Sequence, residues 1–253
     1  MLSRRQLRIK VMEALYAYYS HDMPDQKAHY EELTTVFDHI LDLYYNQLAL
    51  LVELRIEVNR TLDKAKLKHI PTDEDLNPNM HFVNNSILVS LQHDRKLKAL
   101  TKSKKIKWNN ADFIGKIVRA IKQSHEYAEY LELDEVSFED DRKFLKRIFK
   151  RQVMDNELLD NYYSEGNLYW AANIDIANRL VLDTIDDYKQ SSVFATKPRS
   201  HVITKLLSKE EQAFVKKLFE LTIKHDADFQ QWIAEKAKNF YASRIAVMSM
   251  LLI

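Results

Sequence analysis

Residues 30–62 read YEELTTVFDHILDLYYNQLALLVELRIEVNRTL and contain neither glycine nor proline. Apolar side chains recur in this stretch at intervals of three and four residues, from Tyr30 and Phe37 to Val58 and Leu62. Such spacing places them on one face of a helix, whereas a strand would need an interval of two. The stretch therefore predicts one helix of about 35 residues, about 50 Å long if it is unbroken.

The rest of the chain follows the same spacing and predicts an all-α fold, a bundle of helices. Only two glycines and four prolines occur in 253 residues, so most of the chain is free of helix breakers. Capping boxes at Ser3–Gln6 and Ser208–Glu211 predict the starts of two helices. After a loop at 71–79, further helices are predicted at about 86–100, 110–131, 137–152, 156–164, 167–188, 229–240 and from 243 onward. Gly166 is predicted to stop the helix at 156–164.

The composition excludes several classes of enzyme. Two glycines, Gly115 and Gly166, cannot supply a phosphate-binding loop, a dinucleotide-binding turn or a nucleophile elbow. The absence of cysteine excludes disulfides, thiolate metal sites and cysteine nucleophiles, and it fits a reducing compartment. We expect a protein that is not an enzyme, with no catalytic residues, no cofactor and no metal.

The pattern of apolar residues also bears on the location of the protein. No apolar run approaches the roughly 18 residues of a membrane span, and the N-terminus lacks the apolar core of a signal peptide. We expect a cytoplasmic protein with no membrane contact. The chain stops at Met250-Leu251-Leu252-Ile253. Because chain termini are usually polar, we expect the natural chain to continue beyond Ile253.

Charge is segregated along the chain although the net charge is only +1. Taken singly, a run of charges is more often a solvated face than a binding site. Three basic groups stand out, and an acidic cluster at 126–141 precedes the last of them. The groups are Arg4, Arg5, Arg8 and Lys10; Arg95, Lys96, Lys98, Lys102, Lys104, Lys105 and Lys107, which ends at Trp108; and Arg142, Lys143, Lys146, Arg147, Lys150 and Arg151.

The first helix combines its arginines with tyrosines. Projected at about 100° per residue, Arg5, Arg8, Tyr16 and Tyr19 fall within about 80° of one another, beside the apolar stripe. Guanidinium groups that neutralise phosphates and phenol rings that stack on bases suit single-stranded RNA. From these residues alone the alternative is equally good: the tyrosines belong to the core and the arginines keep the terminus soluble.

The stretch from Arg4 to Tyr16, RRQLRIKVMEALY, resembles the opening helix of the NusB family of bacterial transcription antitermination factors. A second stretch, from Phe214 to Leu252, is similar to the central helices of the same family. The resemblance implies an all-α fold of the NusB type. It also implies binding of boxA-type ribosomal RNA leader sequence together with a NusE-like small-subunit ribosomal protein, within an antitermination complex on RNA polymerase. The residues that it marks as RNA-binding are Arg4, Arg5, Arg8 and Tyr16.

The resemblance covers only the two ends of the chain. It implies one domain over 1–253 with a core formed by 1–20 and 208–253 and a helical insertion at 21–207. Because no linker rich in Gly, Ser and Pro flanks the insertion at 20–27, we expect it to pack on this core. The chain lacks the closing helices of the family, and no small residue stands at Leu221. A second hypothesis is a helical protein-protein scaffold without RNA binding, which would dock through the long helix at 30–62. A third, the RNA-recognition domain of an RNA methyltransferase, requires a catalytic domain beyond Ile253, because the glycine content here is too low.

Overall fold

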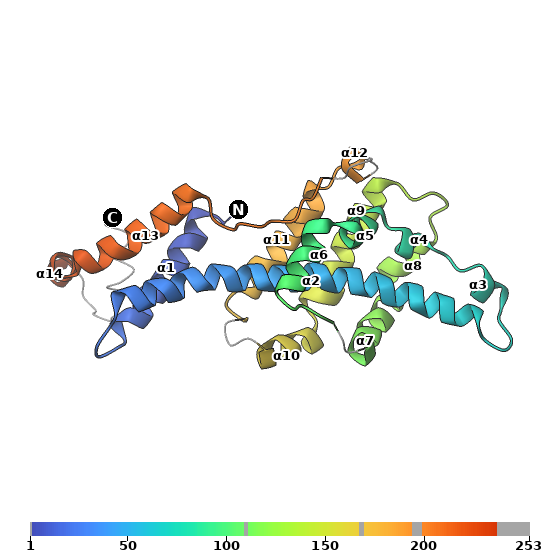
Figure 1. Cartoon of the computed structure of the whole chain (residues 1–253), viewed down its shortest axis with the longest axis horizontal. Coiled ribbons are helices and arrows are strands. Elements are labelled where there is room, and N and C mark those ends of the chain that lie inside the picture. Colours follow the sequence, from blue (N-terminus) through green and yellow to red (C-terminus); the bar gives the residue numbers. More distant parts are fainter. Residues whose placement is uncertain (1, 109–110, 167–169, 194–198, 237–253) are drawn as a thin grey trace. The chain divides into compact units, whose positions relative to one another are not determined.

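The computed structural model describes residues 2–108, 111–166, 170–193 and 199–236. Throughout these ranges the regular structure is helical and no strand occurs, which confirms the predicted all-α fold (Figure 1). The helix predicted at 243 and the end of the one predicted at 229–240 lie outside the described residues, as does the part of the stretch 214–252 that follows residue 236.

The chain forms two compact units. Unit 1 contains residues 1–41 and 204–253, and unit 2 contains residues 42–203. The long helix α2, Gln26–Lys66, begins in unit 1 and ends in unit 2. Its 41 residues confirm the predicted long helix and correspond to about 60 Å at a rise of 1.5 Å per residue. The packing of 21–207 on the terminal segments stays a prediction.

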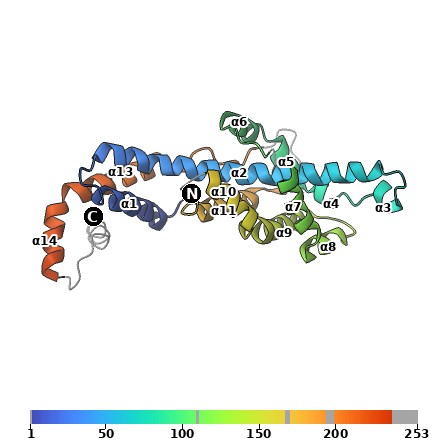
Figure 2. The ribbon, with the colours of Figure 1, turned by 90° about the horizontal axis from the view of Figure 1, so that it is seen from below.

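Unit 1 brings the first helix of the chain against a helix near the C-terminal end. Helix α1, Arg4–Tyr19, contacts α13, Lys209–Lys224, and the two lie side by side in both views (Figure 1, Figure 2). Helix α14, Asp226–Lys236, follows. Both predicted capping boxes are present: the Ser3 and Ser208 hydroxyls accept from the backbone N–H of Gln6 and Glu211. The buried side chains of the two packed helices are mainly apolar: Leu7, Val11 and Leu15 of α1 and Val215, Leu218 and Phe219 of α13.

Unit 2 contains more and shorter helices than its apolar spacing predicts. They are α3 (Asp73–Leu76), α4 (His81–Asn84), α5 (Ser86–His93), α6 (Arg95–Ser103), α7 (Ala111–Lys122), α8 (His125–Leu131), α9 (Phe138–Ile148), the π-helix η1 (Phe149–Met154), α10 (Glu157–Gly166), α11 (Ile174–Asp187) and α12 (Gln190–Val193). Gly166, predicted as the residue that stops α10, is the last residue of that helix. Helix α11 begins at Ile174, later than the predicted start at 167.

Two predicted helices are each divided by a polar capping residue. The Asp94 carboxylate accepts from the backbone N–H of Lys96 and Leu97, which ends α5 and starts α6. The Ser124 hydroxyl accepts from the N–H of Tyr127 and separates α7 from α8. Asp and Ser satisfy the free N–H groups of a helix start, so each break is locally stable.

A buried polar cluster ties three helices of unit 2 together. One oxygen of the Asp141 carboxylate on α9 accepts from the hydroxyl of Tyr130 on α8, and the other accepts from the backbone N–H of Ser86 at 2.7 Å. The Asn85 amide donates to the backbone oxygen of Asp141 at 3.1 Å. Tyr130 also stacks on Phe144, with ring centres 3.9 Å apart. Because Asp141 and Tyr130 are buried, these bonds compensate for lost hydration.

Candidate nucleic-acid interface

Three of the four predicted RNA-binding residues lie exposed on the outer face of α1. Arg5, Arg8 and Tyr16 are exposed, and the side chain of Tyr16 keeps 53% of its accessible surface. The side chains of these three residues form no hydrogen bond or ion pair with another residue in the described ranges. The alternative that Tyr16 belongs to the core is therefore wrong, although Tyr19 is half-buried.

Tyr19 is oriented toward the last described helix. Burial raises the pKa of its phenol, and the carboxylate of Asp226 on α14 raises the pKa further. The ring of Tyr18 meets that of Tyr19 edge to face at 5.2 Å between ring centres. Of the two tyrosines that the helical projection placed beside the arginines, only Tyr16 is free to meet a ligand.

Arg4, the fourth predicted RNA-binding residue, has a contact within unit 1. Its guanidinium carbon lies 4.2 Å from the centre of the Phe214 ring on α13, which is a cation–π arrangement. The side chain is nevertheless exposed. Arg4 therefore joins α1 to α13, and it can still present N–H donors to solvent. Lys10, the last residue of the first basic group, is buried and pairs with Glu13 at 3.0 Å.

The structure adds an apolar residue to this face that the sequence reasoning did not single out. Ile9 is 39% exposed and lies one helical turn after Arg5. Its place outside the buried stripe of Leu7, Val11 and Leu15 is the sequence signal that could have identified it. We name Arg5, Arg8, Ile9 and Tyr16 the α1 face.

Four of the six residues of the third basic group pair with carboxylates of their own unit. Arg147 pairs with Glu129 at 3.1 Å, and Lys146 pairs with Asp186 at 2.6 Å. Arg151 pairs with the buried Glu126, and Arg142 pairs with Glu139. The acidic cluster at 126–141 thus supplies partners for much of the basic group that follows it. This surface is a network of ion pairs and offers little free charge to an anion.

The second basic group differs from the third. Lys104 pairs with Asp42 at 2.8 Å. The other members form no ion pair or hydrogen bond through their side chains with any residue that the structure describes; these are Arg95, Lys96, Lys98, Lys102, Lys105 and Lys107. The carboxylate within this segment, Asp94, is buried and accepts from backbone N–H groups at the start of α6. The segment 95–107 therefore keeps most of its positive charge.

Over the described ranges, no three His, Asp or Glu side chains come together in a way that could hold a metal ion. Across the same part of the chain, no helix combines the length and the apolar character that crossing a membrane requires.

Comparison with known proteins gives no relative for this chain. No protein-family model, no curated protein and no solved structure matches it.

Proposed function

We propose that this protein binds single-stranded RNA through the α1 face. The observation that carries the proposal is that Arg5, Arg8 and Tyr16 are exposed on one face of α1, whose other face is buried, and that neither arginine is paired with a residue that the structure describes. The two guanidinium groups supply charge for phosphates, and the exposed phenol supplies a plane for a base.

The capping and packing of α1 favour RNA binding by a surface that is already formed in the free protein. The capping box at Ser3 and Gln6 fixes the start of the helix. Leu7, Val11 and Leu15 bury its inner face, and Arg4 contacts Phe214. A ligand that meets a rigid helix does not have to order it, so less binding free energy is lost.

The resemblance to the NusB family gives this proposal its specific form. The protein would be a cytoplasmic, non-enzymatic transcription antitermination factor. It would bind boxA-type ribosomal RNA leader sequence together with a NusE-like small-subunit ribosomal protein, and the pair would join the antitermination complex on RNA polymerase. Support for this form comes from the residues between Arg4 and Tyr16 and between Phe214 and Leu252.

A second candidate function is a helical scaffold that binds only protein. One observation favours it: Leu67 and Ile70, just beyond the end of α2, are 84% and 83% exposed. Two large apolar side chains so close together on a surface are typical of a protein-binding site.

A titration of the full chain with labelled RNA separates the two functions. A boxA-type strand and a scrambled strand of equal length are each titrated, with and without the NusE-like protein. The proposal predicts tighter binding of the boxA-type strand, and a further gain with the partner. Equal and negligible binding of both strands in both conditions would contradict it and favour the scaffold.

A further inference from the structure

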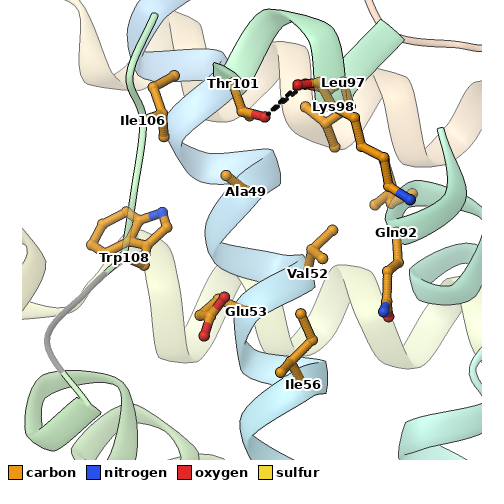
Figure 3. Close-up of a pocket in the computed structure, with 11 residues that line it drawn as sticks. Ala49, Val52, Glu53, Ile56, Gln92, Leu97, Lys98, Thr101, Ile106 and Trp108 are labelled. Atoms are coloured by element: carbon orange, nitrogen blue, oxygen red, sulfur yellow. Dashed lines mark hydrogen bonds between the residues drawn. The ribbon is translucent and has the colours of Figure 1, made fainter. Parts of the chain in front are cut away.

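A groove lies beneath the basic helix α6. It has a volume of about 310 Å³ and is bordered by α2, α5, α6 and the segment that leads to Trp108, all within unit 2 (Figure 3). Val52 and Ile56 of α2 form its apolar floor, with Leu97 and Ile106 on the walls. The indole N–H of Trp108 donates to the backbone oxygen of Asn46 at 3.1 Å, which fixes this wall.

A row of cations on α6, which we call the rim, reaches the groove lining at Lys98. Arg95, Lys98 and Lys102 follow one another at i, i+3 and i+7, so they share one stripe of α6. Lys98 and Leu97 both line the groove, and Leu97 is buried. A single helix thus carries an apolar side chain into the groove and a row of unpaired charges along its edge.

This arrangement costs stability in the free protein. Lys98 and Lys102 are like charges one turn apart, and Arg95 and Lys96 stand in the first turn, where the helix dipole disfavours positive charge. In the same unit, four of the six basic residues at 142–151 are paired with carboxylates, as in Arg147–Glu129. An unpaired row of cations in the same unit indicates an anionic partner.

Two polar groups stand inside the groove. The Glu53 carboxylate has no hydrogen bond or ion pair with any described residue, and partial burial and the neighbouring Glu57 raise its pKa. The Gln92 amide oxygen accepts from Arg55, which leaves the amide nitrogen as a donor. Glu53 and Gln92 lie on either side of Val52 and Ile56 (Figure 3). A desolvated carboxylate favours a ligand that brings an N–H donor.

We propose that this groove and its rim bind a nucleotide of single-stranded RNA, with phosphates on Arg95, Lys98 and Lys102 and the amino group of a cytosine or adenine on Glu53. The proposal rests on the proposed RNA-binding function and adds a second contact surface to it. Carboxylates accept from the exocyclic amino group of cytosine, and single-stranded bases expose that edge. An acidic peptide fits the rim equally well but would bring its carboxylates toward Glu53, so the groove favours RNA.

The test uses the full chain and oligomers of C, A and U of one length. Wild type is expected to bind oligo-C or oligo-A at least about fivefold more tightly than oligo-U, because uracil lacks the amino group. Glu53→Met keeps the approximate size of the side chain, removes the acceptor and should abolish this preference. Lys98→Ala/Lys102→Ala should flatten the dependence of log K on log salt by about 1.4 for every oligomer.

The matched control is Lys143→Ala/Lys150→Ala, which removes the same charge from exposed positions of unit 2. Helix content and unfolding midpoint are measured for each variant. The base preference in Glu53→Met is a ratio of two affinities, so the change in net charge caused by this substitution largely cancels in it. Equal effects of the two double variants on the slope, or a base preference unchanged in Glu53→Met, would overturn the proposal. So would displacement of RNA by polyglutamate with the base preference absent. If only variants of the α1 face weaken binding, this proposal fails and the proposed function stands.

Discussion

The guanidinium of Arg4 lies over the ring of Phe214, with 4.2 Å between the guanidinium carbon and the ring centre. This contact links α1 to α13 within unit 1. Arg5 and Arg8, on the same helix, have no such partner among the residues that the structure describes. Arg4 therefore has a packing contact, whereas Arg5 and Arg8 can bind an anion.

Replacement of Arg4 should lower stability. Arg4→Ala removes the cation–π contact and should reduce the free energy of unfolding by about 0.5–1 kcal/mol, as is usual at an exposed site. Urea unfolding followed by circular dichroism measures the change, with Arg8→Ala as the matched control. An Arg4→Ala midpoint equal to that of Arg8→Ala would show that the contact contributes nothing.

Loss of the Tyr130 hydroxyl should destabilise unit 2. Tyr130→Phe leaves one oxygen of the buried Asp141 carboxylate without its donor. An unsatisfied buried acceptor costs about 1–3 kcal/mol, and more when it is charged. Thermal unfolding is the measurement, and Tyr127→Phe, at another buried tyrosine on α8, is the control. If the two variants melt together, the Tyr130–Asp141 bond is not stabilising.

The stability of the protein should depend on pH through His201. Burial lowers the pKa of this imidazole from its ordinary value of 6.5, and its ring lies 4.6 Å from that of Tyr188, centre to centre. The unfolded chain therefore takes up a proton at a higher pH than the folded one, so stability falls as the pH drops through 6.5. His201→Gln should make the stability less sensitive to pH between about 7 and 5.

Chemical denaturation at several pH values measures this dependence. The control is His69→Gln, which replaces an exposed histidine of the same unit. A pH dependence that is the same in wild type and in His201→Gln would exclude His201 as its source.

The sequence predicted those features that depend on neighbouring residues. The breaker-free stretch at 30–62 is continuous helix, and the capping boxes at Ser3 and Ser208 start α1 and α13. The breaks at Asp94 and Ser124 were missed because such residues are also tolerated within helices, and only tertiary packing decides which role they take.

The candidate sites were predictable only in part, because the partners of charged residues are distant in sequence. The exposed side of α1 followed from its apolar stripe. Only the folded structure shows that Arg151 pairs with Glu126 and that Arg4 contacts Phe214. It also shows that the basic group at 142–151 is largely paired with carboxylates, whereas the group at 95–107 is largely unpaired among the described residues.

The most direct test of RNA binding by the α1 face is the salt dependence of affinity for a boxA-type single strand. Replacing Arg5 and Arg8 by Ala should flatten the slope of log K against log salt by about 1.4, since each phosphate contact on a single strand contributes about 0.7. Tyr16→Leu should weaken binding by about 1–3 kcal/mol at every salt concentration, because stacking releases no counterions. The control Lys209→Ala/Lys217→Ala removes two exposed lysines from α13 and should change neither quantity. The account is contradicted if both α1 variants bind with the affinity and slope of wild type, and wild type binds the boxA-type strand no better than an unrelated one.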